Sequence, residues 1–203
     1  AELYESVRLA MDTRLKDIIA EKGLKRSQIE VLDALLKLRQ VCNHPKLLSL
    51  EGAKKVNQSA KLDHLMETVP ELIAEGRKII IFSQFTSMLA LIEEALVEEG
   101  IDFVKLTGAT TKRQEVVDKF QTGEVPIFLI SLRAGGVGLN LTAADTVIHF
   151  DPWWNPAVEN QATDRAYRIG QDKPVFVYKY IIENSIEEKI QKIQKKINKN
   201  RKI

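Results

Sequence analysis

The sequence PIFLISLRAGGVGLN, residues 126–140, joins a continuous apolar run to a glycine-rich turn. An apolar run without polar alternation is typical of a strand buried on both faces of a sheet. Gly135, Gly136 and Gly138 permit positive φ and close backbone approach, so their amides can face an anion. The stretch therefore predicts a buried strand that ends in an anion-binding turn, although a tight strand-to-helix connection would use the same residues.

Further apolar runs with β-branched or aromatic residues predict strands at residues 78–85, 103–107, 146–151 and 175–181. Helical patterns lie between or after them, at residues 86–99, 111–121, 157–168 and 186–200. This alternation predicts an α/β fold with a mostly parallel sheet covered by helices on both faces. Right-handed crossovers would then bring the loops that follow the strands to one edge of the sheet.

The first quarter of the chain differs in pattern. Residues 1–56 contain no strand-like run, and a leucine stripe at helical spacing stops at Asn43-His44-Pro45, where proline disfavours helix. A short polar stretch at residues 51–58 reads as a linker. We therefore expect a small helical segment over residues 1–57 and an α/β lobe with a C-terminal helix over residues 58–203. The sequence begins without Met and already in helical pattern, so we expect it to be a piece of a longer polypeptide.

The composition excludes several classes of protein. Hydrophobic residues make up 44% and charged residues 29%, as in globular domains, and no apolar run approaches the roughly 18 residues of a membrane span. We therefore expect no membrane partner. Cys42 is the single cysteine and the three histidines are scattered, which excludes an internal disulfide and predicts no metal site. The net charge of +2 is too small to argue for nucleic acid by itself.

The most informative charged residues are Arg165 and Arg168, in the sequence QATDRAYRIGQ. On a helix, residues three apart leave the same face, with Gln161 one turn further back, so the two guanidinium groups can converge on one anion. Two ion-paired arginines on a surface helix would show the same spacing.

Polar and aromatic residues also follow the predicted strands. Ser83 and Gln84, and Thr107 and Gly108, are neutral groups suited to donating hydrogen bonds to phosphates, although strand-end hydroxyls also cap helices. The loop sequence DPWWNP places two tryptophans side by side at residues 153 and 154. We expect one indole to be exposed and able to stack on nucleotides; the alternative is that both rings pack beneath the loop.

Taken in order, LRQVCNHP, FSQF, LTG, SLRAGGVGLNLT, DPWWNP and QATDRAYRIGQ resemble the second RecA-like lobe of Swi/Snf-type helicase-like ATPases of superfamily two, over nearly the whole chain. This resemblance implies a RecA-like fold and the C-terminal motor lobe of a double-stranded-DNA translocase of the chromatin-remodelling and DNA-repair group. RIGQ separates this family from general RNA helicases. Tyr167 stands where the family often has His, and Leu132 where it often has Thr, so a hydrogen bond to phosphate from position 132 is not expected.

The resemblance also implies roles for individual residues. Arg165 and Arg168 would be catalytic arginine fingers, and Gly138, Asn140 and Gln161 would line the nucleotide cleft. The DNA backbone would be contacted by Ser83, Gln84, Thr107, Gly108, Ser131, Arg133, Ala134, Gly135 and Trp154.

Two features of such a motor are missing from the sequence. It contains no G-x-x-x-x-G-K-[ST] loop and no Asp-Glu pair at a strand end. ATP with Mg²⁺ would thus be held mainly by the N-terminal RecA-like lobe of the same polypeptide, and we expect the isolated chain not to hydrolyse ATP. The intact protein would be a monomeric DNA-dependent ATPase, cytoplasmic at the nucleoid in a prokaryote, which the composition favours, or nuclear in a eukaryote. The alternatives are a lobe of an RNA helicase and a non-catalytic protein-interaction module on a RecA-like fold.

Overall fold

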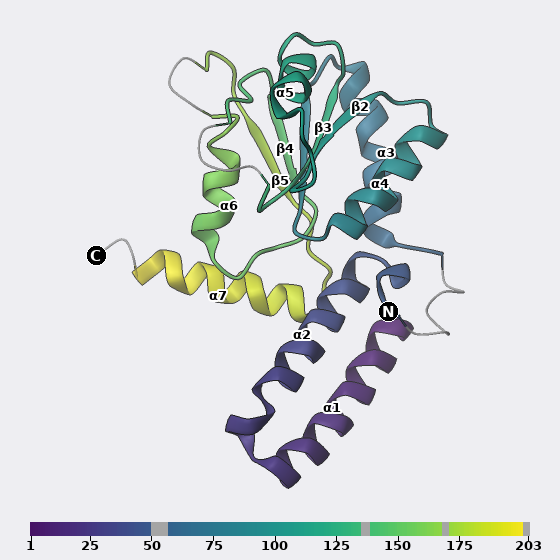
Figure 1. Cartoon of the computed structure of the whole chain (residues 1–203), viewed down its shortest axis with the longest axis vertical. Coiled ribbons are helices and arrows are strands. Elements are labelled where there is room, and N and C mark those ends of the chain that lie inside the picture. The colour runs from purple at the N-terminus through teal and green to yellow at the C-terminus, as the bar shows by residue number, and fades with distance from the viewer. Residues whose placement is uncertain (50–56, 135–138, 168–170, 201–203) are drawn as a thin grey trace.

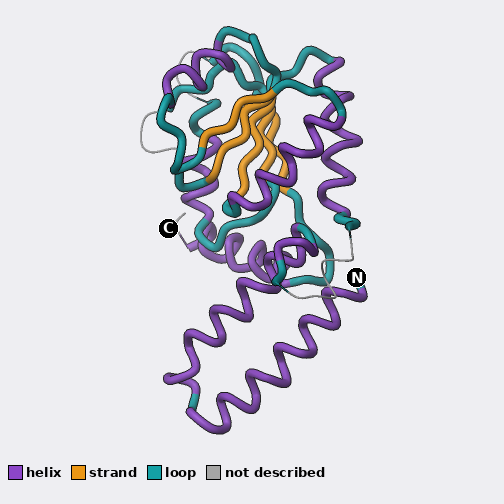
Figure 2. Tube along the Cα trace, turned by 45° about the vertical axis from the view of Figure 1, so that its right-hand side comes forward, coloured by secondary structure: helices purple, strands orange, loops and turns teal. Residues whose placement is uncertain are grey.

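The computed structural model describes residues 1–49, 57–134, 139–167 and 171–200 (Figure 1). The chain opens with a helical hairpin of α1, Glu2–Lys22, and α2, Gln28–Asn43. The short 3-10 helix η1, Leu24–Ser27, joins them, and a second one, η2, Pro45–Leu47, follows α2. Figure 2 shows this hairpin projecting away from the rest of the molecule. No helix among the described residues is long and apolar enough to cross a bilayer.

The remainder of the chain is built on five parallel strands in the order β2-β3-β1-β4-β5. Their bounds are β1 Ile79–Ser83, β2 Phe103–Leu106, β3 Ile127–Ser131, β4 Thr146–His149 and β5 Phe176–Lys179. All five predicted strands are present, each shorter than its apolar run. The expected RecA-like α/β fold is confirmed, with β1 at the centre of the sheet.

Helices cover both faces of the sheet because the central strands alternate their side chains between two apolar clusters. Ile79 and Ile81 of β1 pack on one face with α3, Ala60–Ala74, and α4, Thr86–Glu98. Ile80 and Phe82 pack on the other face with α5, Arg113–Gln121, and α6, Pro156–Thr163. Helix α3 was not foreseen; it tolerates Pro70 in its interior and buries Leu65, Val69 and Leu72 against the sheet.

Two elements border this core. β5 is an edge strand whose four residues are all exposed, although its apolar sequence resembles that of the buried strands. α7, Ile186–Asn200, runs beside α2 beneath the carboxyl ends of the strands, as Figure 1 shows. The carboxyl ends of β1 and β4 therefore meet both the base of the hairpin and α7. We call the carboxyl ends of the five parallel strands, together with the loops after them, the carboxyl edge.

Candidate functional site

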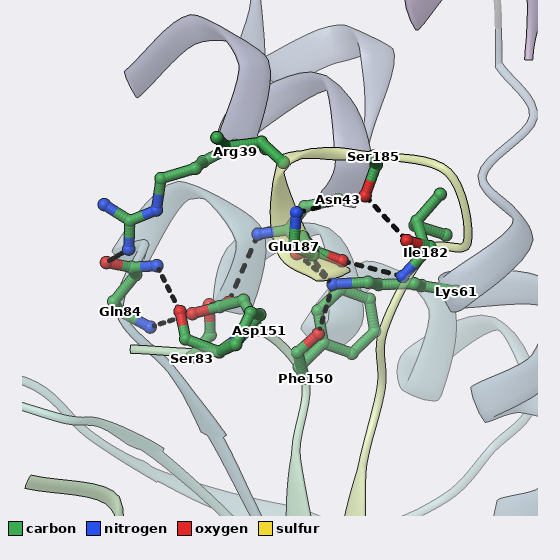
Figure 3. Close-up of polar contacts among 12 residues, drawn as sticks. Arg39, Asn43, Lys61, Ser83, Gln84, Phe150, Asp151, Ile182, Ser185 and Glu187 are labelled. Atoms are coloured by element: carbon green, nitrogen blue, oxygen red, sulfur yellow. Dashed lines mark hydrogen bonds and ion pairs between the residues drawn. The ribbon is translucent and has the colours of Figure 1, made fainter. Parts of the chain in front are cut away.

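A buried carboxylate organises the carboxyl edge. Asp151 follows β4 and accepts three hydrogen bonds (Figure 3). The donors are the Ser83 hydroxyl, the backbone amide of Gln84 at 3.1 Å and Asn43 Nδ2 at 3.2 Å. The Ser83 hydroxyl also accepts from the Phe85 amide at 3.1 Å, and Ser83 is fully buried. In this conformation Ser83 holds the loop after β1. It does not cap α4, which begins after Phe85 without a side-chain cap, so the capping alternative is not met by Ser83. Its contact with DNA stays a prediction.

The same edge contains a fully buried ion pair between α3 and α7. Lys61 Nζ lies 2.7 Å from Glu187 Oε2, and also donates to the Phe150 carbonyl at 2.7 Å and to Asn43 Oδ1 at 2.9 Å. All three ammonium protons thus have acceptors. Burial raises the pKa of the Glu187 carboxyl, and the neighbouring Lys61 opposes that shift. The pair fixes α7 and the base of α2 to the sheet, and neither residue was singled out from the sequence.

The two tryptophans are both partly buried, so the expectation that one indole is exposed is wrong for this structure. Trp153 packs on the core under α5 and α6; its backbone N–H lies 3.4 Å from Glu159 Oε2, and its carbonyl accepts from Gln194 of α7. Trp154 packs with Cys42, Ile186 and other residues between α2 and α7. Arg39 of α2 lies over both rings, and α7 packs on the Trp154 ring, so these two helices cover this part of the edge. A DNA contact by Trp154 stays a prediction.

The loop after β3 is tied back on itself. The Ala134 amide donates to the Ser131 carbonyl at 3.1 Å and is 3.2 Å from the Ser131 hydroxyl, and both residues are buried. The carbonyl of Ala134 accepts from Arg113 of α5. Arg133 is exposed, with its guanidinium carbon 5.8 Å from the centroid of the Trp153 ring. Of the DNA contacts predicted in this loop, only Arg133 presents a charged group to solvent, and Gly135 lies outside the described residues.

The loop after β2 offers smaller groups. Thr107 is partly buried and its amide donates to the Thr110 hydroxyl at 2.9 Å, which forms a turn. Gly108 is exposed, and a Cβ placed there would meet nothing within 4 Å. This position is open to a ligand, and no steric contact within the chain requires glycine there.

The described residues predicted to meet the nucleotide come from three segments: Gln161 from α6, Arg165 from the turn after it, and Asn140 from the loop after β3. That helix ends at Thr163 and not at residue 168, so Arg165 stands in a turn after the helix that carries Gln161. Arg165 is 7% exposed, with its guanidinium carbon 5.8 Å from the centroid of the Phe82 ring. Gln161 and Asn140 are exposed. Because Arg165 is not on a helix, the prediction that it shares a helical face with Arg168 is wrong for Arg165. Arg168 and Gly138 themselves lie outside the described residues.

Backbone contacts join this turn to the loop after β3. The Leu141 amide donates to the Arg165 carbonyl at 3.0 Å. Gln171 Nε2 lies within hydrogen-bond distance of three carbonyls, those of Thr142 at 2.7 Å, Ala166 at 3.0 Å and Ala144 at 3.2 Å. Gln171 was noted in the sequence only as part of RIGQ. Its side chain holds the segment before β4 against the turn that carries Arg165.

Two buried titratable groups sit behind the edge. Burial lowers the pKa of His149 to about 4 and raises the pKa of the Cys42 thiol to about 12. His149 stacks on Phe82 with ring centroids 5.4 Å apart, and its Nε2 is 3.0 Å from the Thr163 hydroxyl. Both groups are therefore neutral near pH 7 and act as core residues. Among the described residues, no three His, Cys, Asp or Glu side chains gather as a metal site.

Comparison with known proteins finds similar sequences and structures. Residues 60–170 match the helicase conserved C-terminal domain. An uncharacterized ATP-dependent helicase of Mycoplasma pneumoniae is 42% identical over 196 residues, which cover 95% of this chain and 18% of that protein. The chain spans about a fifth of the length of the curated relatives that it matches.

Two solved structures from Sulfolobus solfataricus are also similar. Its SWI2/SNF2 ATPase C-terminal domain is 33% identical with a TM-score of 0.75, covering 96% of this chain and 81% of that one. Its SWI2/SNF2 ATPase core in complex with dsDNA is 37% identical with a TM-score of 0.76, covering 94% of this chain and 40% of that one.

Proposed function

This chain belongs to the helicase conserved C-terminal domain family, in its SWI2/SNF2 branch, and from that premise we propose that it is the second motor lobe of an ATP-dependent double-stranded-DNA translocase. The full-length protein would bind ATP between this lobe and an N-terminal RecA-like lobe, and would move along duplex DNA. The Sulfolobus solfataricus ATPase core was solved in complex with dsDNA, which supports this choice of nucleic acid.

The proposal rests chiefly on one backbone hydrogen bond, which connects the loop after β3 to the turn after α6. The first is the predicted DNA loop and the second holds Arg165, and the Leu141–Arg165 backbone bond of 3.0 Å connects them. A displacement of one segment by its ligand is therefore felt by the other. Such a connection is what reciprocal coupling between DNA binding and ATP hydrolysis requires.

The arginines would supply the chemistry of this lobe. A guanidinium keeps its charge at all working pH values and forks onto phosphate oxygens, so it stabilises the charge that spreads over a transferring γ-phosphoryl group. Closure of the two lobes would bring ATP held by the first lobe against Arg165 and Arg168. The described residues offer no set of metal ligands, so Mg²⁺ would be held by the other lobe.

Contacts with DNA would be made mainly to the backbone. The exposed predicted groups at the carboxyl edge are the Arg133 guanidinium and the Gly108 backbone, neither of which requires a particular base. Phosphate contacts fix the register of a protein on the duplex but read no sequence. We therefore expect salt-sensitive binding with little sequence preference.

Substitution of the second arginine in the full-length protein tests the proposal. Arg168→Ala should lower steady-state ATP turnover by roughly two to four powers of ten, with small changes in ATP and duplex affinity, because the contact acts mainly in the transition state. Arg168→Lys should recover little, since a point charge lacks the fork. Arg165→Ala should be severe as well and should also weaken nucleotide binding.

Arg77→Ala is the matched control. Arg77 precedes β1 at the opposite edge of the sheet, where it ion-pairs with Glu75 and lies 4.2 Å from the Phe176 ring centroid. Near-normal turnover by Arg168→Ala would refute the finger assignment. Stimulation of turnover by duplex RNA in preference to duplex DNA would favour an RNA helicase, and no nucleic-acid-stimulated turnover at all would favour a non-catalytic module.

A further inference from the structure

Arg39 of α2 lies at the centre of an aromatic cluster on the carboxyl edge. Its guanidinium carbon is 5.5 Å from the Trp153 ring centroid, 5.7 Å from that of Trp154 and 5.8 Å from that of Phe85. Phe85 belongs to the loop after β1, and the tryptophans belong to the loop after β4. One side chain from the helical hairpin thus contacts both loops, at distances where a cation is attracted to the face of an aromatic ring.

The guanidinium also fixes the side chain of Gln84. It donates a hydrogen bond to Gln84 Oε1, as Figure 3 shows. Arginine has only donors, so the Gln84 oxygen must face Arg39 and the amide nitrogen must face the other way. That nitrogen lies 3.4 Å from the Pro152 carbonyl, which belongs to the loop after β4. Within the described part of the chain, Pro152 is the one acceptor found for this nitrogen, so its second proton can be donated to a ligand, and phosphate oxygens only accept hydrogen bonds.

Arg39 has no direct ion-pair partner among the described residues, although it is only 9% exposed. Among the described residues, Arg39 Nε also has no hydrogen-bond partner. Buried charges are normally paired with an opposite charge, because desolvation is costly. Three rings and an amide contact the guanidinium directly, whereas the carboxylates of Asp151 and Glu187 act on it from beyond ion-pairing distance. Burial lowers the pKa of Arg39, and these two carboxylates oppose that shift.

We propose that Arg39 is a positioning residue for DNA binding: it turns the Gln84 amide nitrogen toward the DNA backbone and holds the loops after β1 and β4 together. The inference rests on the proposed DNA-translocase function. It also gives the helical segment before the lobe a part in DNA binding, through a residue that touches neither DNA nor nucleotide. The Gln84 side chain would donate a hydrogen bond to a DNA phosphate, and Arg39 would hold that side chain from the protein side.

The test is a double-mutant cycle in the full-length protein, read by ATP turnover as a function of duplex DNA concentration. Arg39→Met keeps the length of the stem but removes the charge and the donors. It should raise the half-saturating DNA concentration by about tenfold, while turnover at saturating DNA falls by less than about threefold. Gln84→Ala should give a similar increase, and the double variant should be no worse than the more affected single variant within about twofold, because both changes remove one arrangement.

Arg77→Met is the control for removing an arginine that stacks on an aromatic ring elsewhere in the lobe, and it should leave the DNA dependence unchanged. The inference is overturned if Arg39→Met behaves like Arg77→Met, or if the effects of Arg39→Met and Gln84→Ala multiply in the double variant. A wild-type protein that is not stimulated by DNA overturns the proposed function itself, and the inference with it.

Thermal melting of each variant detects a loss of folding. Where Arg39→Met melts early, Arg39→Lys replaces it: the lysine retains a charge over the rings but cannot reproduce the guanidinium fork, so the half-saturating DNA concentration should still rise, by about threefold. DNA dependence like that of wild type in a folded Arg39→Lys overturns the inference.

Discussion

The sheet lobe and the helical hairpin are stabilised in different ways. In the lobe, β1, β3 and β4 are completely buried between two layers of helices. In the hairpin, the apolar cluster between the two helices buries Val7 and Val41, with Leu48 just beyond η2, whereas Ile29 and Leu24 are 80% and 66% exposed. The lobe has its own apolar core. The hairpin is fixed at its base by polar contacts to the carboxyl edge, chiefly Asn43 to Asp151 and Arg39 to Gln84. A small apolar cluster around Cys42 and Ile190 also joins α2 to α7.

Similar interactions therefore contribute differently in the two regions. An ion pair at the base is desolvated, and removing one partner leaves a buried charge behind. An ion pair along the outer hairpin is exposed to solvent and contributes little to the free energy of unfolding.

A pair of lysine substitutions tests the contrast most directly. Lys61→Met should lower the free energy of unfolding by about 3–5 kcal/mol, because Glu187 loses its buried partner. Lys16→Met, which removes the exposed Asp12 ion pair of α1, should change it by less than about 0.5 kcal/mol. Urea denaturation followed by circular dichroism measures both. Equal losses in the two variants would contradict the distinction between base and outer hairpin.

Acid should destabilise the lobe through His149. The folded-state pKa is about 4 and the ordinary value is 6.5, so the unfolded state binds the proton more readily between these pH values. The contribution of neutral His149 is complete above pH 6.5 and is lost as the pH falls to about 4, a total of roughly 3 kcal/mol.

Denaturation of wild type and His149→Phe across this pH range isolates the effect. Wild type should lose stability relative to the variant as the pH falls. The raised pKa of Glu187 acts in the opposite direction and is common to both proteins, so it cancels in the difference. Parallel stability curves would show that His149 is not the group responsible.

Local opening should separate the regions by a smaller amount. Amides of the outer hairpin around η1 should exchange with solvent through local unfolding at least about 2 kcal/mol below the opening free energy of β1 and β3. Hydrogen exchange with mass spectrometry on peptides from the two regions measures this difference. Equal protection would mean that the hairpin and the sheet open together and that the polar base couples them fully.

The sequence predicted the lobe well because its signal is local. Continuous apolar runs identified all five strands, and the residues at their ends were expected at one edge. The same reasoning failed where burial depends on topology: β5 has the apolar pattern of a buried strand, but its edge position leaves Phe176 and Tyr178 exposed. The end of α6 was also placed too late, which put Arg165 on a helix instead of in a turn.

The organisation of the carboxyl edge could not be predicted, because its contacts join distant segments. Asn43 and Asp151 are 108 residues apart, and Lys61 and Glu187 are 126 apart. No periodicity in one sequence pairs such residues. A buried lysine with its glutamate looks the same in a sequence as two residues of a solvated surface. The segment LRQVCNHP contains Arg39 and Asn43, and the resemblance singled out that segment without indicating what its side chains contact.

The hydrogen bond from the Ile186 amide to the Tyr4 hydroxyl, 2.8 Å long, spans 182 residues. During synthesis at about 5–20 residues per second, roughly 10–40 s separate the appearance of its two partners. Asn43 and Arg39 can find their sheet partners earlier, but Glu187 and the α7 face that covers Trp154 emerge among the last segments of this chain. The contacts that α7 makes with the carboxyl edge can therefore form only after Tyr4, Arg39 and Asn43 have already been synthesised.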